Sequence, residues 1–166
     1  MLQREFNISS LLCQDEDGNY RCATPEEIIT AARLEINSMF QRGKALTSPD
    51  VTRDYLQLRF AHYEHEVFSI LWLDTRHHVI AFEELFRGTI DGASVYVREV
   101  VKSALRHNAA ACIFCHNHPS GIPEPSQSDK HITQRLKDAL SLVEIRSLDH
   151  IIVGEQTYSF AEHGLI

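Results

Sequence analysis

The sequence contains no apolar run long enough to cross a membrane, which takes about 18 or more consecutive apolar residues. It also contains no internal repeat and no low-complexity segment. With 166 residues, of which 43% are hydrophobic and 23% are charged, the chain has the composition of an ordinary globular protein. This length excludes two large domains and suits about one domain of typical size with a modest extension.

The first residues lack the apolar core and the small-residue cleavage site of a secretory signal, so we expect a cytoplasmic protein. Only four cysteines are present, and in such a protein they are expected to be reduced thiols rather than a disulfide framework. Cys112 and Cys115 have the spacing of a zinc or redox pair, but they fall in an apolar run that predicts a buried strand. Cysteine in such a strand is commonly a small hydrophobic residue, so we favour a structural role for this pair.

An excess of basic charge is absent as well, because 16 Lys and Arg stand against 23 Asp and Glu, for a formal net charge of −7. Attraction to phosphate backbones depends on clusters of cations that displace counterions, so the composition does not support a nucleic-acid partner. Histidine, by contrast, is abundant, with ten residues. Six of them fall in close pairs, namely His62, His65, His77, His78, His116 and His118. Metal binding is therefore worth testing, although most histidines are simply surface or hydrogen-bonded residues.

Two helix-start signals divide the chain. The segment Thr24-Pro-Glu-Glu combines a hydroxyl N-cap, a proline at the first helical position and a capping-box glutamate, and it predicts a helix to about residue 42. The segment Ser48-Pro-Asp predicts the start of a second, short helix. We place a boundary at residues 44–47, with a helical N-terminal extension at 1–45 and the main domain at 46–166.

Helices and strands alternate along the main domain. The apolar runs at residues 67–73 and 79–86 predict a β-hairpin. The patterns that follow predict a helix at 98–107, a buried strand at 109–115 and a proline-stiffened loop at 119–125. A further helix is predicted from the apolar spacing of Ile132, Leu136, Leu140 and Val143, and strands are predicted at 145–153 and 158–161. The order predicts an α/β (α+β) fold with a single mixed β-sheet flanked by helices.

One segment carries the chemistry of a metal site. His116 and His118 leave the end of the predicted buried strand on the same side of an extended backbone, so both can reach one ion. Asp129, in the first turn of the next predicted helix, can fold back to supply an oxygen. Three such ligands leave the fourth coordination position of a zinc ion open for water. Zinc would lower the pKa of that water to about 7, so the pattern implies metal-assisted hydrolysis. Ser126 can cap the helix or act in catalysis, and the pattern leaves both roles open.

The pattern His-x-His, seven residues, Ser, two residues, Asp resembles the JAMM (MPN+) metalloprotease motif. The surrounding sequence is similar to the bacterial RadC branch of that family over about residues 49–166. The similar segments are Glu84-Leu-Phe-Arg-Gly-Thr, Arg98-Glu-Val, Asn108-Ala-Ala-Ala, His116-Asn-His-Pro-Ser-Gly, Pro125-Ser126 and Asp149-His-Ile-Ile-Val-Gly. The resemblance implies a JAMM/MPN-like fold, with a cytidine-deaminase-like three-layer arrangement, for residues 46–166.

The resemblance also implies a zinc-dependent metallopeptidase or isopeptidase that acts on a peptide or protein substrate. Three ligands would hold Zn²⁺, namely His116, His118 and Asp129. Ser126 would help to stabilise the oxyanion. The family places its general acid/base glutamate early on the strand that follows the first helix of the domain. We choose Glu66, which opens the predicted strand at 67–73, although a solvated charge at a helix-to-strand junction is the alternative. Glu83 and Glu84 rank second.

Two features depart from the RadC branch. Tyr96-Val97 stands where that branch usually has His-Pro, and residues 1–45 show no glycine-containing hairpin of the helix-hairpin-helix type. We therefore expect a short form, and the DNA association that such a module suggests is not carried over. A DNA-repair accessory protein and a metal-binding interaction module without turnover remain the alternative functions. Asp149 and His150 begin the penultimate predicted strand, and we expect them either to be structural or to contact the metal ligands without binding the metal.

Because the sequence shows no basic stripe, we predict only weak, non-specific binding to duplex DNA that disappears as salt rises toward physiological concentration. Fluorescence anisotropy of a labelled duplex, titrated over a series of salt concentrations, measures this affinity. Submicromolar affinity at physiological salt would contradict the prediction and favour the DNA-repair alternative.

Overall fold

The computed structural model describes residues 11–15, 18–39, 41–43, 45, 48–61, 63–88 and 94–166. It divides into two compact units, Met1–Ser38 and Met39–Ile166. The predicted boundary at 44–47, apart from Ala45, and the paired histidine His62 lie outside the described residues. Among the helices that are described, none is both long and apolar enough to cross a membrane.

The first unit holds a small hairpin and a helix. Strands β1 (Leu12–Gln14) and β2 (Tyr20–Cys22) pair antiparallel, and α1 (Pro25–Met39) follows. The helix begins where the sequence predicts, because the Thr24 hydroxyl accepts the Glu27 N–H at 3.3 Å and the Glu27 carboxylate accepts the Thr24 N–H at 2.8 Å. The hairpin was not predicted, since its three-residue strands are mostly exposed and give no apolar alternation.

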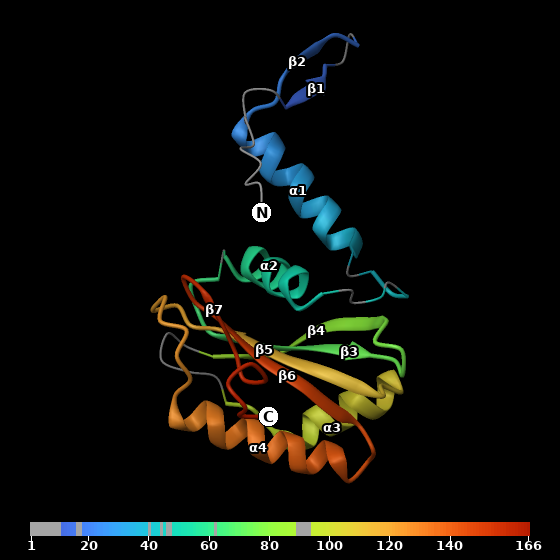
Figure 1. Cartoon of the computed structure of the whole chain (residues 1–166), viewed down its shortest axis with the longest axis vertical. Helices are drawn as coiled ribbons and strands as arrows, with labels where there is room; N and C mark the ends of the chain where they lie inside the picture. The colour runs from blue at the N-terminus through green and yellow to red at the C-terminus, as the bar shows by residue number, and fades with distance from the viewer. Residues whose placement is uncertain are drawn as a thin grey trace. The chain divides into compact units, whose positions relative to one another are not determined.

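The second unit is built on a five-stranded mixed sheet with the order β4-β3-β5-β6-β7 (Figure 1). Its strands are β3 (Val67–Leu73), β4 (Val79–Arg87), β5 (Ala111–Asn117), β6 (Arg146–Val153) and β7 (Thr157–Ser159). Strand β3 pairs antiparallel with β4 and β5, whereas β5 and β6 are parallel. The predicted mixed sheet flanked by helices is confirmed. Strand β5 runs two residues beyond its predicted end, so that it includes His116 and Asn117.

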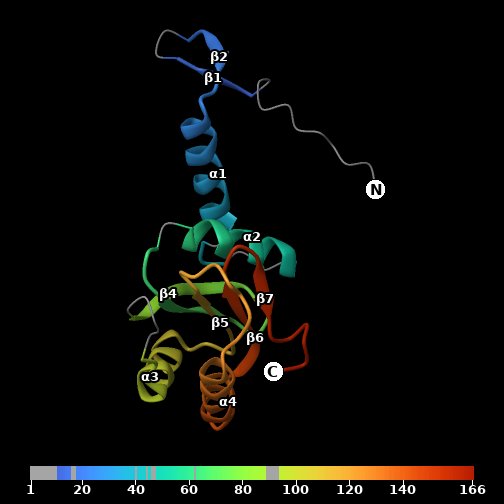
Figure 2. The same cartoon turned by 90° about the vertical axis from the view of Figure 1, so that its left-hand side faces the viewer.

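Helices cover both faces of this sheet. Figure 2 shows α2 (Pro49–Phe60) on one face, with α3 (Val97–His107) and α4 (Gln127–Ser141) on the other. The three layers form because the central strands β3 and β5 are buried along their whole length and present apolar side chains to both faces.

The core below the sheet fixes the position of α4. Leu136 and Leu140 of this helix are completely buried and belong to a cluster with Phe68 and Trp72 of β3 and Phe114 of β5. Burial of such side chains contributes about 1.5–3 kcal/mol each, so this face of α4 is strongly held against the sheet. The N-terminus of α4 therefore lies at a defined place beside the end of β5.

Candidate metal centre

Three residues with metal-binding side chains meet at the carboxyl end of β5. His116 lies in β5, His118 in the loop that follows, and Asp129 in the first turn of α4. Their ligand atoms all lie within 4.8 Å of one another. In the part of the chain that the structure describes, no other group of three or more His, Cys, Asp or Glu residues is arranged in this way. These are the three residues that the sequence analysis proposes as metal ligands.

The separations within this cluster suit a single ion. Nε2 of His116 lies 3.0 Å from Nε2 of His118 and 3.4 Å from Oδ1 of Asp129. Nε2 of His118 lies 3.6 Å from Oδ2 of Asp129. A tetrahedral zinc ion with bonds of about 2.0–2.1 Å holds its ligands roughly 3.3 Å apart. The donor set and its spacing therefore fit zinc.

The loop after β5 fixes His118 in place. Nδ1 of His118 donates a hydrogen bond to the carbonyl of Ile122 at 2.7 Å, which directs Nε2 at the cluster. The His118 N–H donates to the carbonyl of Val153 at 2.8 Å. Gly154 lies so close to the loop that a Cβ atom there would stand 2.3 Å from the carbonyl oxygen of Gly121. The loop is thus packed against the turn between β6 and β7, and only glycine fits at that contact.

The start of α4 holds Asp129. The Ser126 hydroxyl accepts the Asp129 N–H at 3.1 Å and donates to Asp129 Oδ2 at 2.6 Å. Oδ2 also accepts the Ser126 N–H at 2.7 Å, so the two residues form a reciprocal capping box. The capping role that the sequence leaves open for Ser126 is therefore present in the structure. The same carboxylate serves the helix and the cluster.

Charge states in the cluster follow from burial and contact. Burial lowers the pKa of His116 to about 4, so this histidine is neutral at pH 7. The hydrogen bond to Asp129 raises the pKa of His118, and the charge of Glu66 contributes to the same shift. Burial by itself would raise the pKa of Asp129, but the contacts with His118, His116 and Ser126 lower it. The site thus holds the ionised carboxylate of Asp129 beside His118, whose raised pKa favours its protonated form. A metal ion that binds His118 must displace this proton.

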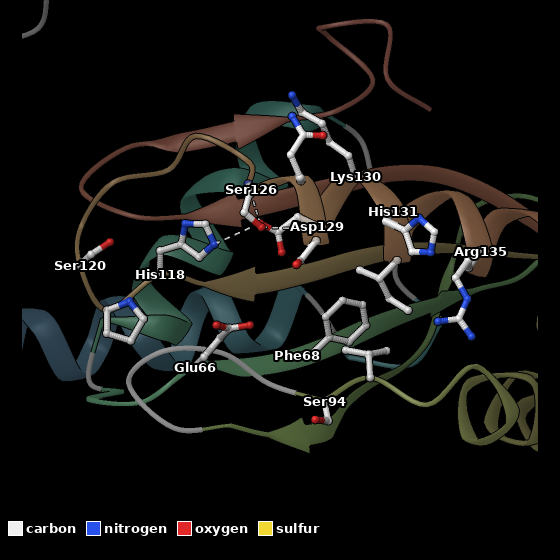
Figure 3. Close-up of a pocket in the computed structure, with 15 residues that line it drawn as sticks. Glu66, Phe68, Ser94, His118, Ser120, Ser126, Asp129, Lys130, His131 and Arg135 are labelled. Atoms are coloured by element: carbon white, nitrogen blue, oxygen red, sulfur yellow. Dashed lines mark hydrogen bonds and ion pairs between the residues drawn. The ribbon is translucent and has the colours of Figure 1, made fainter.

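Glu66 lies in the same cleft as the cluster. This cleft has a volume of about 1240 Å³, and Glu66, His118, Ser126 and Asp129 all line it (Figure 3). Figure 3 shows Glu66 entering from the start of β3, on the other side of the cleft from Ser126. The Glu66 carboxylate, two of the three candidate ligands and the Ser126 hydroxyl therefore face one cleft, while His116 is buried behind it.

The second-ranked glutamates lie elsewhere, and neither lines this cleft. Glu84 accepts hydrogen bonds from Tyr63 at 2.6 Å and from Arg59 at 3.3 Å. Glu83 accepts hydrogen bonds from four side chains, those of Trp72, Ser103, Arg106 and His107. Both carboxylates are occupied in joining β4 to neighbouring helices and loops.

The cysteine pair does not form a second metal site. Cys112 and Cys115 lie three positions apart on β5, so their side chains leave opposite faces of the sheet. Burial raises the pKa of Cys112 to about 12 and raises that of Cys115 as well. Both are neutral buried thiols.

Asn117, between the two histidines, holds the backbone around Glu66. Its side-chain oxygen accepts the Val67 N–H at 2.8 Å, and its amide donates to the carbonyl of His65 at 3.0 Å. The carbonyl of Glu66 itself accepts the N–H of Gly88 at 2.8 Å. No sequence motif points to Asn117, although strand alternation requires its side chain to point away from the side that His116 and His118 share.

Comparison with known proteins gives a consistent result. Residues 46–165 match the family model of the RadC-like JAB domain. The chain is 58% identical over 149 residues to a UPF0758 protein of Thioalkalivibrio sulfidiphilus, with 90% of this chain and 67% of that protein covered. It is 62% identical over 135 residues to a UPF0758 protein of Nitrosococcus oceani, with 81% of this chain and 60% of that protein covered.

A third relative matches over most of its own length. The UPF0758 protein of Vibrio cholerae is 55% identical over 142 residues, which are 86% of this chain and 90% of that protein. The chain thus spans 60% to 67% of the first two relatives and most of the third.

Metal content tests the cluster directly. We predict that purified protein binds about one zinc ion per chain, and that His118→Ala and Asp129→Ala each release it, because two remaining ligands hold zinc poorly. His131→Ala is the matched control, since His131 lines the same cleft but is not part of the cluster. Mass spectrometric metal analysis after dialysis measures the stoichiometry. Full metal content in both ligand variants would place the site elsewhere.

Denaturation tests the contacts of Asn117. We predict that Asn117→Ala lowers the free energy of unfolding by about 1–3 kcal/mol, because two backbone groups beside Glu66 lose their partner, one of them in a buried bond. Gln156→Ala, in an exposed turn, is the control and should change that free energy by less than about 0.5 kcal/mol. Urea unfolding curves give both values. Equal midpoints for the two variants would show that the Asn117 bonds do not hold this segment.

Proposed function

Because the chain belongs to the RadC-like JAB domain family, we propose that it is a zinc-dependent metallopeptidase or isopeptidase of the JAMM type. The observation that carries the proposal is the cluster of His116, His118 and Asp129, of which His118 and Asp129 line a cleft together with Glu66. Structural zinc sites usually have four protein ligands, whereas three ligands are typical of catalytic zinc. The proposed substrate is a peptide or protein chain, because cleavage of peptide or isopeptide bonds is the activity that the resemblance to JAMM enzymes implies.

The ligands of Zn²⁺ would be Nε2 of His116, Nε2 of His118 and a carboxylate oxygen of Asp129. When bound, zinc polarises a substrate carbonyl and lowers the pKa of water at the site to about 7. Packing of the loop and the capping box hold these groups in place before substrate arrives.

We assign Glu66 the role of general acid/base. Its carboxylate accepts the proton of the attacking water and then delivers it to the amine that leaves. This role needs a carboxylate beside the ligands but not among them, and Glu66 lines the cleft without being part of the three-residue cluster. The hydrogen bonds of Asn117 to His65 and Val67, on either side of Glu66, fix the position of the Glu66 backbone.

We assign Ser126 the role of stabilising the oxyanion. It lines the cleft opposite Glu66, and its hydroxyl lies 2.6 Å from Asp129 Oδ2. A hydroxyl that is held by a capping box can turn its hydrogen toward the negative charge that develops on the carbonyl oxygen. Helix capping and oxyanion stabilisation are thus two uses of one side chain.

Substitution of the glutamate separates catalysis from metal binding. We predict that Glu66→Gln retains zinc but lowers peptide hydrolysis by about 100- to 10,000-fold, because the shape of the side chain stays while its basicity is lost. Glu84→Gln is the matched control and should retain both zinc and activity, since Glu84 lies outside the cleft. Metal analysis and initial rates on a library of peptides and lysine-ε-linked isopeptides provide the two measurements.

Three outcomes would change the assignment. Hydrolysis that survives in Glu66→Gln and disappears in Glu84→Gln would mean that the base is misplaced while the reaction class stands. Absence of cleavage by zinc-loaded wild-type protein would favour the metal-binding interaction module without turnover. Tight DNA binding together with such absence would favour the DNA-repair accessory role.

A further inference from the structure

A chain of hydrogen bonds runs behind the cluster, from one candidate ligand to another. Nδ1 of His116 lies 2.8 Å from Nε2 of His150 in β6. Nδ1 of His150 lies 2.6 Å from Oγ1 of Thr133 in α4. The Thr133 hydroxyl in turn lies 2.5 Å from the carbonyl oxygen of Asp129, one turn earlier in the same helix. These hydrogen bonds lie in the protein interior, since His116, Thr133 and His150 are each at most 1% exposed.

The last bond of this chain sets the direction of the others. The carbonyl of Asp129 can only accept, so the single hydroxyl proton of Thr133 is donated to it. Oγ1 of Thr133 must then accept from His150, which places a proton on Nδ1 of His150. A neutral imidazole carries one N–H, so Nε2 of His150 accepts, and Nδ1 of His116 is the donor. Nε2 of His116 is left with its lone pair facing His118 and Asp129.

The surroundings of His150 keep it neutral. Its ring packs against the rings of Phe68, Phe114 and Phe160, with centroids 5.6, 5.8 and 4.7 Å away. His150 is completely buried among these rings, and such an apolar environment disfavours a charged imidazolium. A doubly protonated His150 would donate to His116 and force the His116 proton onto Nε2, so neutrality is needed for the order of donors described above.

We propose that His150 and Thr133 are positioning residues that hold His116 as its Nδ1–H tautomer and so present its Nε2 lone pair to a divalent metal ion. This inference rests on the metal centre of the proposed function but not on the reaction. A histidine that ligates a metal usually donates its other N–H to a partner, and loss of that partner typically weakens metal affinity 10- to 100-fold. Here the partner is a second histidine, whose own tautomer depends on a threonine.

The arrangement also links two ligands through one threonine. Thr133 contacts the backbone of Asp129 directly and reaches His116 through His150. The sequence contains a signal for the first contact, because residues four apart lie on the same face of a helix. The second contact joins residues of α4, β6 and β5 and depends on how these elements pack.

Zinc affinity of matched threonine variants tests the proposal. Thr133→Val removes the hydroxyl and keeps the shape, and we expect it to weaken Zn²⁺ binding about 10- to 100-fold in competition with a chromophoric chelator. Thr133→Ser restores the hydroxyl and should recover most of the affinity. Thr52→Val is the control, because Thr52 is also buried in a helix and also donates to the carbonyl four residues earlier, Ser48, at 3.2 Å. None of the hydrogen bonds described for Thr52 involves a histidine.

A purely structural role of Thr133 predicts a different result. Both valine variants would then lose thermal stability to a similar extent, while zinc affinity would stay at the wild-type value. Unchanged affinity in folded Thr133→Val, checked by circular dichroism, would overturn the proposal.

The tautomers themselves can be observed in metal-free wild-type protein. Two-bond ¹H–¹⁵N correlation spectra of the imidazole rings should show His116 and His150 both as Nδ1–H tautomers. An Nε2–H tautomer at His116 would overturn the proposal even if every variant folds. Failure of the proposed function gives another result, in which zinc-loaded protein cleaves no peptide while the Thr133 variants still change zinc affinity.

Discussion

The pairing of β5 with β3 on one side and β6 on the other is the constraint on which the site depends. The register places His116 beside Phe68 of β3 and beside Ile152 of β6. Because side chains alternate along a strand, His116 turns to the face covered by α4, while Asn117 turns the other way. One strand end therefore supplies a ligand, the link to His150 and the clamp on the backbone of Glu66. A shift of one residue in this register would turn His116 and Asn117 to the opposite faces of the sheet, so that neither could make these contacts.

Much of the site could be predicted because its signals are local. The two histidines, the proline-stiffened loop and the Ser126–Asp129 capping box lie within fourteen residues, and each follows from strand or helix periodicity. Contacts between distant segments could not be predicted in this way. The bond between His116 and His150 joins residues 34 apart, and the bond between Asn117 and Val67 joins residues 50 apart. Such pairs depend on sheet order, which periodicity does not determine.

The glutamates illustrate the same distinction. In the sequence, Glu66, Glu83 and Glu84 all stand near strand ends or within strands, and their local patterns do not decide which one faces the cleft. In the structure, Glu83 binds residues of β3 and α3, and Glu84 binds residues in and just after α2. Adjacent residues of β4 thus reach opposite faces of the sheet, and neither lines the cleft that Glu66 enters from the residue before β3. The β1–β2 hairpin was missed for a related reason, since exposed three-residue strands carry no periodic signal.

The capping box between Ser126 and Asp129 has a thermodynamic consequence for ion capture. A carboxylate on a free side chain loses rotamer freedom when it binds a metal, and that loss opposes binding. Here the freedom of Asp129 is already lost when the first turn of α4 forms, because the carboxylate accepts hydrogen bonds from the N-cap residue. Folding of the helix and preparation of the ligand are one event. The entropy cost of ordering the Asp129 carboxylate is therefore part of the free energy of folding, and it does not oppose the later binding of an ion.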